Sequence, residues 1–151
     1  MRKILFTLFI YISTVFHAFG LAVGTWQVYP SYANLTEISP AGDVCFALAS
    51  GSLFAYNNTT AETTVFNKTT GLAGIDISHI AWSQQAKRLV VAYGDGNIDL
   101  VSASGDITNV PGLYLSETVS DKTVSHIYID RQFAYMSIGV GVMKLDAKKG
   151  V

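Results

Sequence analysis

The sequence predicts an all-β protein, a partial β-propeller of about three four-stranded antiparallel blades. Gly51, Gly96 and Gly141 recur at an even spacing of about 45 residues, and each opens an apolar segment. A second apolar run precedes each glycine, and further upstream a third strand-like element ends in an isoleucine (Ile38, Ile80, Ile127). Several short strands in such a period are typical of propeller blades, which must stack to bury both faces of their sheets.

Before the repeats, residues 1–22 predict a secretory signal peptide. A short basic region, an apolar run and then small residues follow one another (Arg2 and Lys3; Ile4 to Phe16; Ala18, Gly20 and Ala22). This order is that of a signal peptide, and the apolar run is shorter than the about 20 residues of a membrane span. We therefore expect export to the periplasm or the outer-membrane cell surface, no transmembrane span, and cleavage after Gly20 or Ala22.

The strands follow in order. Thr25-Trp-Gln-Val-Tyr29 is a short β-rich run ended by Pro30. The first unit predicts strands over 34–39, 44–50, 52–57 and 62–67, and the second over 77–83, 88–94, 96–102 and 106–110. The third predicts strands over 124–130, 132–138 and 140–146. Turn residues separate the strands, as in Gly94-Asp-Gly-Asn97. After the signal peptide, no segment of useful length shows the hydrophobic periodicity of an α-helix.

Residues 23–151 are thus expected to be the N-terminal part of a β-propeller, with blade-like units over 34–67, 77–110 and 124–151. The third unit lacks a predicted fourth strand, and a closed propeller has at least four blades. We expect the chain to be the amino-terminal piece of a longer protein. The alternatives are that several copies assemble into a ring, or that the piece is an unstable fragment.

Composition excludes several functions. Half of the residues are hydrophobic, 14% are charged and the net charge is −1, which is a globular composition without the basic clusters that nucleic acids require. The single cysteine, Cys45, cannot form an internal disulfide and is expected to be a buried small hydrophobe. No phosphate loop, nucleophile elbow or Cys/His ligand spacing is present, so we expect neither an enzyme nor a cofactor.

Four segments carry a family resemblance: Gly24-Thr-Trp26, Ala47-Leu-Ala-Ser-Gly-Ser-Leu-Phe54, Ala92-Tyr93 with Gly96-Asn-Ile-Asp-Leu100, and Asp121-Lys-Thr123. With them, residues 24–150 resemble the N-terminal β-propeller of PorZ-type proteins, components of the type IX secretion system of the Bacteroidetes. The second unit is also similar to the propeller repeats in periplasmic sensor regions of hybrid two-component regulators.

The resemblance implies a cell-surface scaffold without catalytic activity. PorZ-type proteins belong to a surface attachment complex with the sortase PorU and with PorV and PorQ, and they help to deliver anionic lipopolysaccharide. The expected partners are therefore PorU-, PorV- and PorQ-like proteins and that lipopolysaccharide. Two alternatives remain: a ligand-sensing propeller of a hybrid two-component regulator, and a carbohydrate-active propeller enzyme, which needs paired carboxylates at one end of the channel.

Aligning the three isoleucines places polar residues at one equivalent position of the innermost strands (Glu37, His79, His126). Innermost strands of a propeller face its central channel, so we expect these side chains to line it. Glutamate and histidine can ligate zinc, but neighbouring blades fan apart. We therefore expect a channel lining inherited from the repeat and no metal site.

Turns at the blade ends supply the binding-loop candidates, which are polar or aromatic (Asn57, Asn58, Asp95, Asn97, Tyr114). They lie in loops 57–60, 94–97 and 111–114, which rigid blades would hold in place for contact with a partner. Asp95 to Asp99 alternates oxygen-bearing side chains as calcium loops do, but Leu100 stands where such a loop has glycine, so a hairpin turn is predicted. Trp82 and other aromatics are expected to pack between blades.

Overall fold

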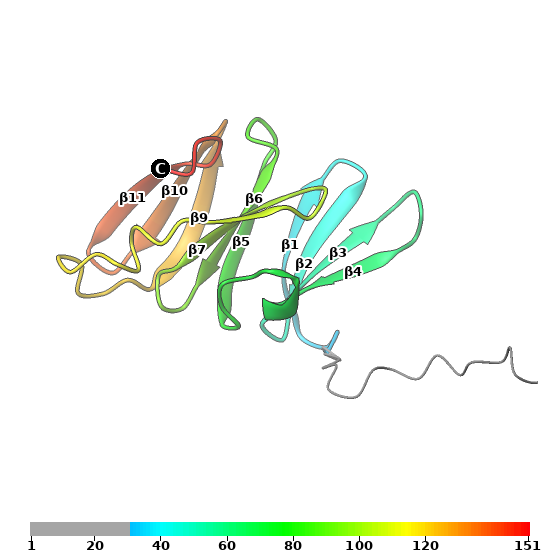
Figure 1. Cartoon of the computed structure of the whole chain (residues 1–151), viewed down its shortest axis with the longest axis horizontal. Helices are drawn as coiled ribbons and strands as arrows, with labels where there is room; N and C mark the ends of the chain where they lie inside the picture. Colours follow the sequence, from blue (N-terminus) through cyan, green and yellow to red (C-terminus); the bar gives the residue numbers. More distant parts are fainter. Residues whose placement is uncertain (1–30) are drawn as a thin grey trace, which may run out of the picture.

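The computed structural model describes residues 31–151, and the all-β prediction is confirmed in them. Eleven strands form three antiparallel sheets, which stand side by side as a fan (Figure 1). The predicted signal peptide and the run Thr25 to Tyr29 lie outside the described residues. Within residues 31–151, no helix has the length and hydrophobicity needed to cross a membrane.

Each sheet is a meander in which strands adjacent in sequence are paired. The first sheet contains β1 (Leu35–Ala41), β2 (Val44–Ala49), β3 (Ser52–Asn57) and β4 (Thr63–Phe66). The second contains β5 (Ile77–Ser83), β6 (Arg88–Tyr93), β7 (Ile98–Ser102) and β8 (Ile107–Asn109). The third contains β9 (Val124–Asp130), β10 (Phe133–Ile138) and β11 (Gly141–Asp146). The predicted strand ends agree to within about two residues, the usual uncertainty of element boundaries.

The second sheet is buried on both faces, which explains its apolar middle strands. Along β6, Leu89 and Val91 join the core shared with the first sheet, whereas Val90 and Ala92 join the core shared with the third. Successive side chains of a strand point to opposite faces, so a strand between two sheets is apolar throughout. Two continuous cores therefore fix the three sheets relative to one another.

Aromatic packing between blades is confirmed for Trp82. Its ring stacks on Phe46 of the first sheet, with ring centroids 5.7 Å apart. The expectation for Cys45 is only partly right, because this side chain is half-buried. Its neighbour on β2, Phe46, belongs to the core shared with the second sheet. Cys45 thus points to the opposite face of the first sheet, where the described residues place no further sheet.

The three repeat glycines share a left-handed backbone, with φ of 73° at Gly51, 84° at Gly96 and 146° at Gly141. Glycine adopts positive φ without the steric cost that a side chain adds, which accounts for its recurrence at these hairpins. Gly141 begins β11, but Gly51 and Gly96 lie in the turns before β3 and β7. The repeat therefore marks hairpin turns as much as strand starts.

A short 3-10 helix, η1 (Lys68–Thr70), lies between the first two sheets and was not predicted. The Asn67 side chain accepts hydrogen bonds from the backbone N–H groups of Thr69 at 2.8 Å and Thr70 at 3.2 Å. The Thr70 hydroxyl in turn accepts one from the Asn67 N–H at 2.8 Å, which completes a capping box. This cap fixes the start of the crossover into the second sheet.

Candidate functional site

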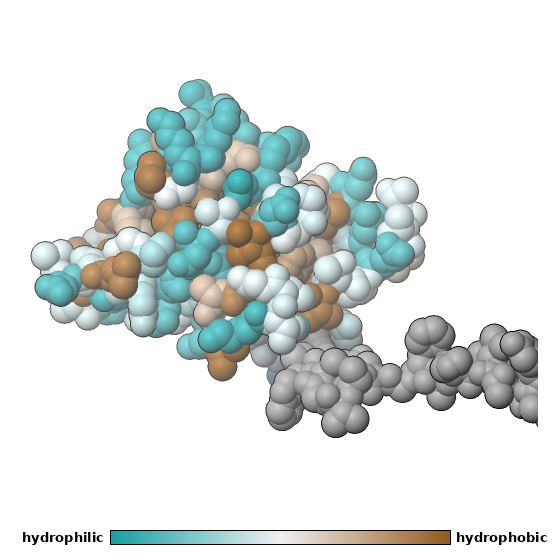
Figure 2. All heavy atoms as spheres, in the orientation of Figure 1, coloured by the Kyte–Doolittle hydropathy of each residue, from teal (hydrophilic) through white to brown (hydrophobic). Residues whose placement is uncertain are grey.

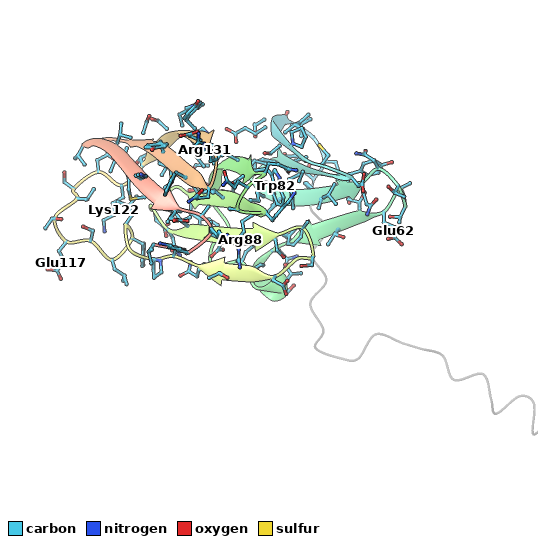
Figure 3. All side chains as sticks on the ribbon, turned by 90° about the horizontal axis from the view of Figure 1, so that it is seen from above. Glu62, Trp82, Arg88, Glu117, Lys122 and Arg131 are labelled. Carbon is cyan, nitrogen blue, oxygen red and sulfur yellow. The ribbon has the colours of Figure 1, made fainter. Side chains whose placement is uncertain are left out.

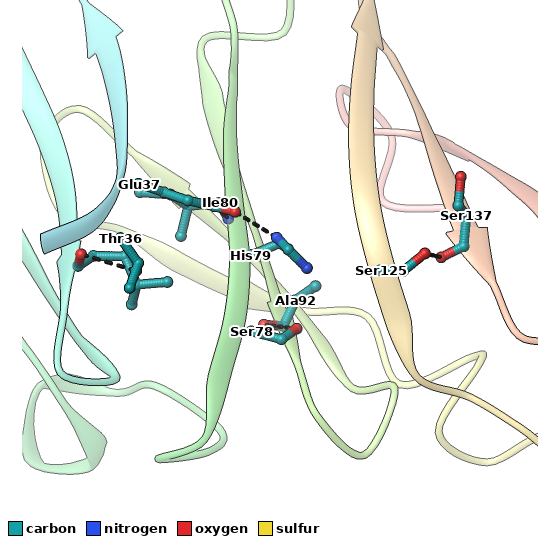
Figure 4. Close-up of polar contacts among 9 residues, drawn as sticks. Thr36, Glu37, Ser78, His79, Ile80, Ala92, Ser125 and Ser137 are labelled. Atoms are coloured by element: carbon teal, nitrogen blue, oxygen red, sulfur yellow. Dashed lines mark hydrogen bonds and ion pairs between the residues drawn. The ribbon is translucent and has the colours of Figure 1, made fainter. Parts of the chain in front are cut away.

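The innermost strand of every sheet contains the same polar device. In each sheet, the pairing of the innermost strand with its neighbour shifts register once. Each shift leaves one bulged residue on the innermost strand, and that residue has a hydroxyl (Thr36 in β1, Ser78 in β5, Ser125 in β9). Each hydroxyl donates to a carbonyl of the neighbouring strand: Leu48 at 3.2 Å, Ala92 at 3.1 Å and Ser137 at 3.2 Å (Figure 4). A bulge disrupts the strand ladder, and these hydroxyls supply partners for the carbonyls.

Glu37, His79 and His126, the aligned polar residues of the inner strands, lie near one another. With three neighbouring isoleucines they line one small hollow of about 170 Å³ between the inner strands. Glu37 Oε1 contacts His79 Nδ1, and Glu37 Oε2 accepts a hydrogen bond from the Ile80 N–H at 2.7 Å (Figure 4). The carboxylate thus joins the first sheet to the second.

Side chains of β1 beside this hollow are bonded to the backbone of β5. Among residues 31–151, no three histidine, cysteine, aspartate or glutamate side chains are grouped as metal ligands would be. One Glu37 oxygen already accepts a backbone N–H of β5. Ser39 repeats this pattern two residues on, because its hydroxyl accepts the Trp82 N–H at 2.7 Å. Side chains of β1 therefore satisfy backbone donors of β5, a role in inter-sheet packing.

The five binding-loop candidates separate into two groups at opposite ends of the strands. Asn57 ends β3 and Asn58 follows it. Both lie beside the turn between β1 and β2, where the Asn58 N–H donates to the Asp43 carbonyl at 2.8 Å. Asp95, Asn97 and Tyr114 line one hollow of about 450 Å³ at the other end. Figure 1 shows η1 and the loop after β6 at the lower edge, and the turns after β1 and β5 at the upper edge.

We call this second feature the loop-face hollow. Lys68, Ala73, Gly74, Ile75, Asp76 and Tyr93 complete its lining. Three connections build it: the crossover 67–76, the hairpin 94–97 and the long loop 110–123. The sequence prediction found its hairpin and long-loop residues but missed those of the crossover.

Asp99, in β7, binds the crossover to the second sheet. Its side chain is fully buried in β7. Asp99 Oδ2 accepts hydrogen bonds from the Ala73 N–H at 2.8 Å and from the Tyr93 hydroxyl at 2.6 Å. Asp99 Oδ1 accepts from Asn109 Nδ2 at 2.8 Å. A buried carboxylate with three donors pins β6, β8 and the crossover to one point.

Tyr93 forms the floor of the hollow, and Gly74 permits its position. A Cβ atom at Gly74 would lie 2.6 Å from Cδ1 of the Tyr93 ring, so only glycine allows this approach. Burial, followed by the contact with Asp99, raises the pKa of the Tyr93 hydroxyl well above its ordinary value. The hydroxyl therefore stays protonated and donates to Asp99 at physiological pH.

Lys122 fixes the wall that carries Tyr114. Lys122 Nζ donates to the Tyr114 carbonyl and lies 5.8 Å from the centroid of the Tyr114 ring. Figure 3 shows Lys122 in the long loop, away from Glu62, which lies in the loop between β3 and β4 that carries Asn58. The Tyr114 side chain remains 45% exposed and is therefore available for contact.

Chemically, the loop-face hollow offers two carboxylates, one ammonium group, one amide and two phenol rings. Asp95 Oδ1 accepts the Asn97 N–H at 2.9 Å, which shapes the hairpin. A water-accessible recess with mixed polar and aromatic lining is typical of a recognition site. The sequence around Asp76 and Lys68 does not distinguish them from solvated loop residues. Their role in the hollow is visible only once the structure places the crossover.

Comparisons with known proteins agree with the fold. Residues 45–151 match the family model of the N-terminal β-propeller domain of PorZ of the type IX secretion system. A solved structure of PorZ, an essential bacterial surface component of that system in Porphyromonas gingivalis, has a TM-score of 0.77 and 31% identity. That match covers 84% of this chain and 17% of PorZ, so the chain spans about a sixth of that protein. No curated protein sequence matches the chain.

Two extracellular domains from B. thetaiotaomicron share the fold. The extracellular domain of one hybrid two-component system has a TM-score of 0.62 at 19% identity, over 78% of this chain and 16% of that one. A second such domain has a TM-score of 0.58 at 20% identity, over 87% of this chain and 19% of that one. Likeness at this identity is a likeness of fold.

Proposed function

Because the chain belongs to the PorZ N-terminal β-propeller family, we propose that it acts outside the cytoplasm as a binding module of a type IX secretion system. In this proposal it is not an enzyme. It contributes to the scaffold of the surface attachment complex, with PorU-, PorV- and PorQ-like proteins and anionic lipopolysaccharide as partners. The observation that carries the proposal is the family match over residues 45–151.

The geometry supports a scaffold role through the rigidity of one end. Two continuous inter-sheet cores hold the sheets, and the buried Asp99 ties the crossover to β7. Loops held in this way keep their contact residues in a fixed arrangement, which is how scaffolds present binding surfaces. We assign the partner contact to the loop-face hollow because three connections meet there. It contains three of the five binding-loop candidates (Asp95, Asn97, Tyr114).

The test is site-specific photo-crosslinking in the native cell envelope. A benzophenone amino acid replaces Tyr114 in one strain and Asn58, at the opposite end, in a second, and the adducts are identified by mass spectrometry. We expect adducts with PorU-, PorV- or PorQ-like proteins from position 114 and few from position 58. Equal yields from both positions, or adducts only with cytoplasmic proteins, contradict the proposal.

A further inference from the structure

We propose that the loop face binds an extended peptide of a partner protein that carries a basic side chain next to an apolar one. The basic side chain enters the loop-face hollow, and the apolar side chain enters a neighbouring apolar hollow. This inference deepens the proposed function and rests on it, because it names the chemistry of the partner at the same site.

The two hollows are adjacent. The apolar hollow, of about 200 Å³, is lined by Phe66, Leu72, Ile77 and parts of η1 and the first-sheet hairpin. It shares Lys68, Gly74 and Ile75 with the loop-face hollow. Both therefore border the same crossover segment, and they make up an apolar half and a polar half of the proposed binding surface. Figure 2 shows hydrophobic and hydrophilic residues side by side on the face of the molecule that it draws.

Charge favours a cation in the polar half. Asp76 and Asp95 contribute two carboxylates to this lining and Lys68 one ammonium group, so the net charge is negative. Lys122 donates to the Tyr114 carbonyl and lies near the ring, outside the lining. A lysine or arginine side chain gains attraction from both carboxylates. An anionic ligand meets repulsion here, so we place the binding of anionic lipopolysaccharide elsewhere.

Ile75 marks the junction as a contact residue. Its side chain is 76% exposed, although it lies between two buried positions of the crossover region, Leu72 and Ile77. An exposed large hydrophobe beside an apolar recess is a common feature of binding surfaces. An extended peptide places side chains along a groove at regular intervals, so adjacent polar and apolar recesses fit such a ligand.

The test uses the full chain and synthetic peptides. Acetylated, amidated glycine–serine peptides carry one lysine and one leucine, separated by one, two or three residues. Matched peptides carry acetyl-lysine or glutamate for the lysine, or serine for the leucine. Binding is measured by titration in ¹H–¹⁵N correlation spectra. We expect shifts at Ile75, Asp76, Asp95 and Tyr114, an affinity about tenfold lower with acetyl-lysine, and weakening by added salt.

Protein variants complete the test. D76N and D95N keep side-chain size and are each expected to lower affinity about threefold, and together about tenfold. D43N at the opposite end is the matched control and should bind as the parent does. Equal binding of the glutamate and lysine peptides, or no loss in D76N/D95N, overturns the inference. Because the peptides test chemistry and the crosslinks test partners, position-114 crosslinks without peptide binding would leave the proposed function standing.

Discussion

Replacing Asp99 with alanine tests whether the buried carboxylate holds the loop face to the fold. The change removes the shared acceptor of the buried Tyr93 hydroxyl and of the part-buried Ala73 N–H. Asn109 is exposed, and its Nδ2 keeps the Asn97 side chain and the Ile98 carbonyl as acceptors. Each buried donor left without an acceptor costs about 1–3 kcal/mol, so we expect the free energy of unfolding to fall by about 2–4 kcal/mol.

The assay is equilibrium urea unfolding followed by far-ultraviolet circular dichroism. A loss of this size lowers the urea midpoint by about 2 M for a domain of this length. Asp99→Asn is the graded comparison, because one amide oxygen at the Oδ2 position still accepts from Ala73 and Tyr93. We expect it to lose about 1–2 kcal/mol, mainly where its amide faces Asn109. A loss below about 1 kcal/mol in Asp99→Ala would refute the reasoning.

Four further changes test other contacts. Because the raised Tyr93 pKa keeps its proton on the folded protein, stability should hold below pH about 10 and decline above it, less steeply in Tyr93→Phe, in urea melts at stepped pH. Glu37→Ala should cost about 1–2 kcal/mol and Glu37→Gln less, since glutamine can still accept the Ile80 N–H. Gly74→Ala should cost about 1–3 kcal/mol by forcing a Cβ against the Tyr93 ring; an unchanged midpoint would contradict this. Lys144→Leu should increase self-association in light scattering, because it removes a charge beside Val142, which is 72% exposed on the same face of β11; Lys148→Leu in a turn should not.

Most of the fold was predictable because a strand between two sheets has a simple sequence pattern. The run from Leu89 to Tyr93 is apolar throughout, and the structure buries every residue in it. Glycines that require positive φ marked the hairpins, Gly51 and Gly96 among them. The 3-10 helix was missed because its signal is a cap, Asn67 with Thr70, rather than a period, and cap residues also suit loops.

The candidate site was predictable only in part, because it is assembled across long sequence separations. Turn chemistry pointed to Asp95 and Asn97, since a hairpin turn is a local feature. The sequence placed Asp99 in the same predicted hairpin turn. In the structure it is fully buried in β7, which lies between two sheets, and the crossover supplies one of its donors. No local pattern shows that Ala73 donates to a residue in β7.

The polar residues of the inner strands show why equivalent repeat positions do not imply equivalent roles. Glu37 and His79 occupy the same position, yet Glu37 accepts the Ile80 N–H with one oxygen and contacts His79 with the other. A histidine ring has two nitrogens in fixed directions, so it cannot copy both contacts of a carboxylate. Lys144 is a second example. The equivalent position in the strand pairing of the second sheet is occupied by the buried Leu100. Its ammonium group lies 3.9 Å from the Phe133 ring centroid, so this face is built differently from the two buried interfaces. Function in a repeat protein therefore has to be sought where the units differ.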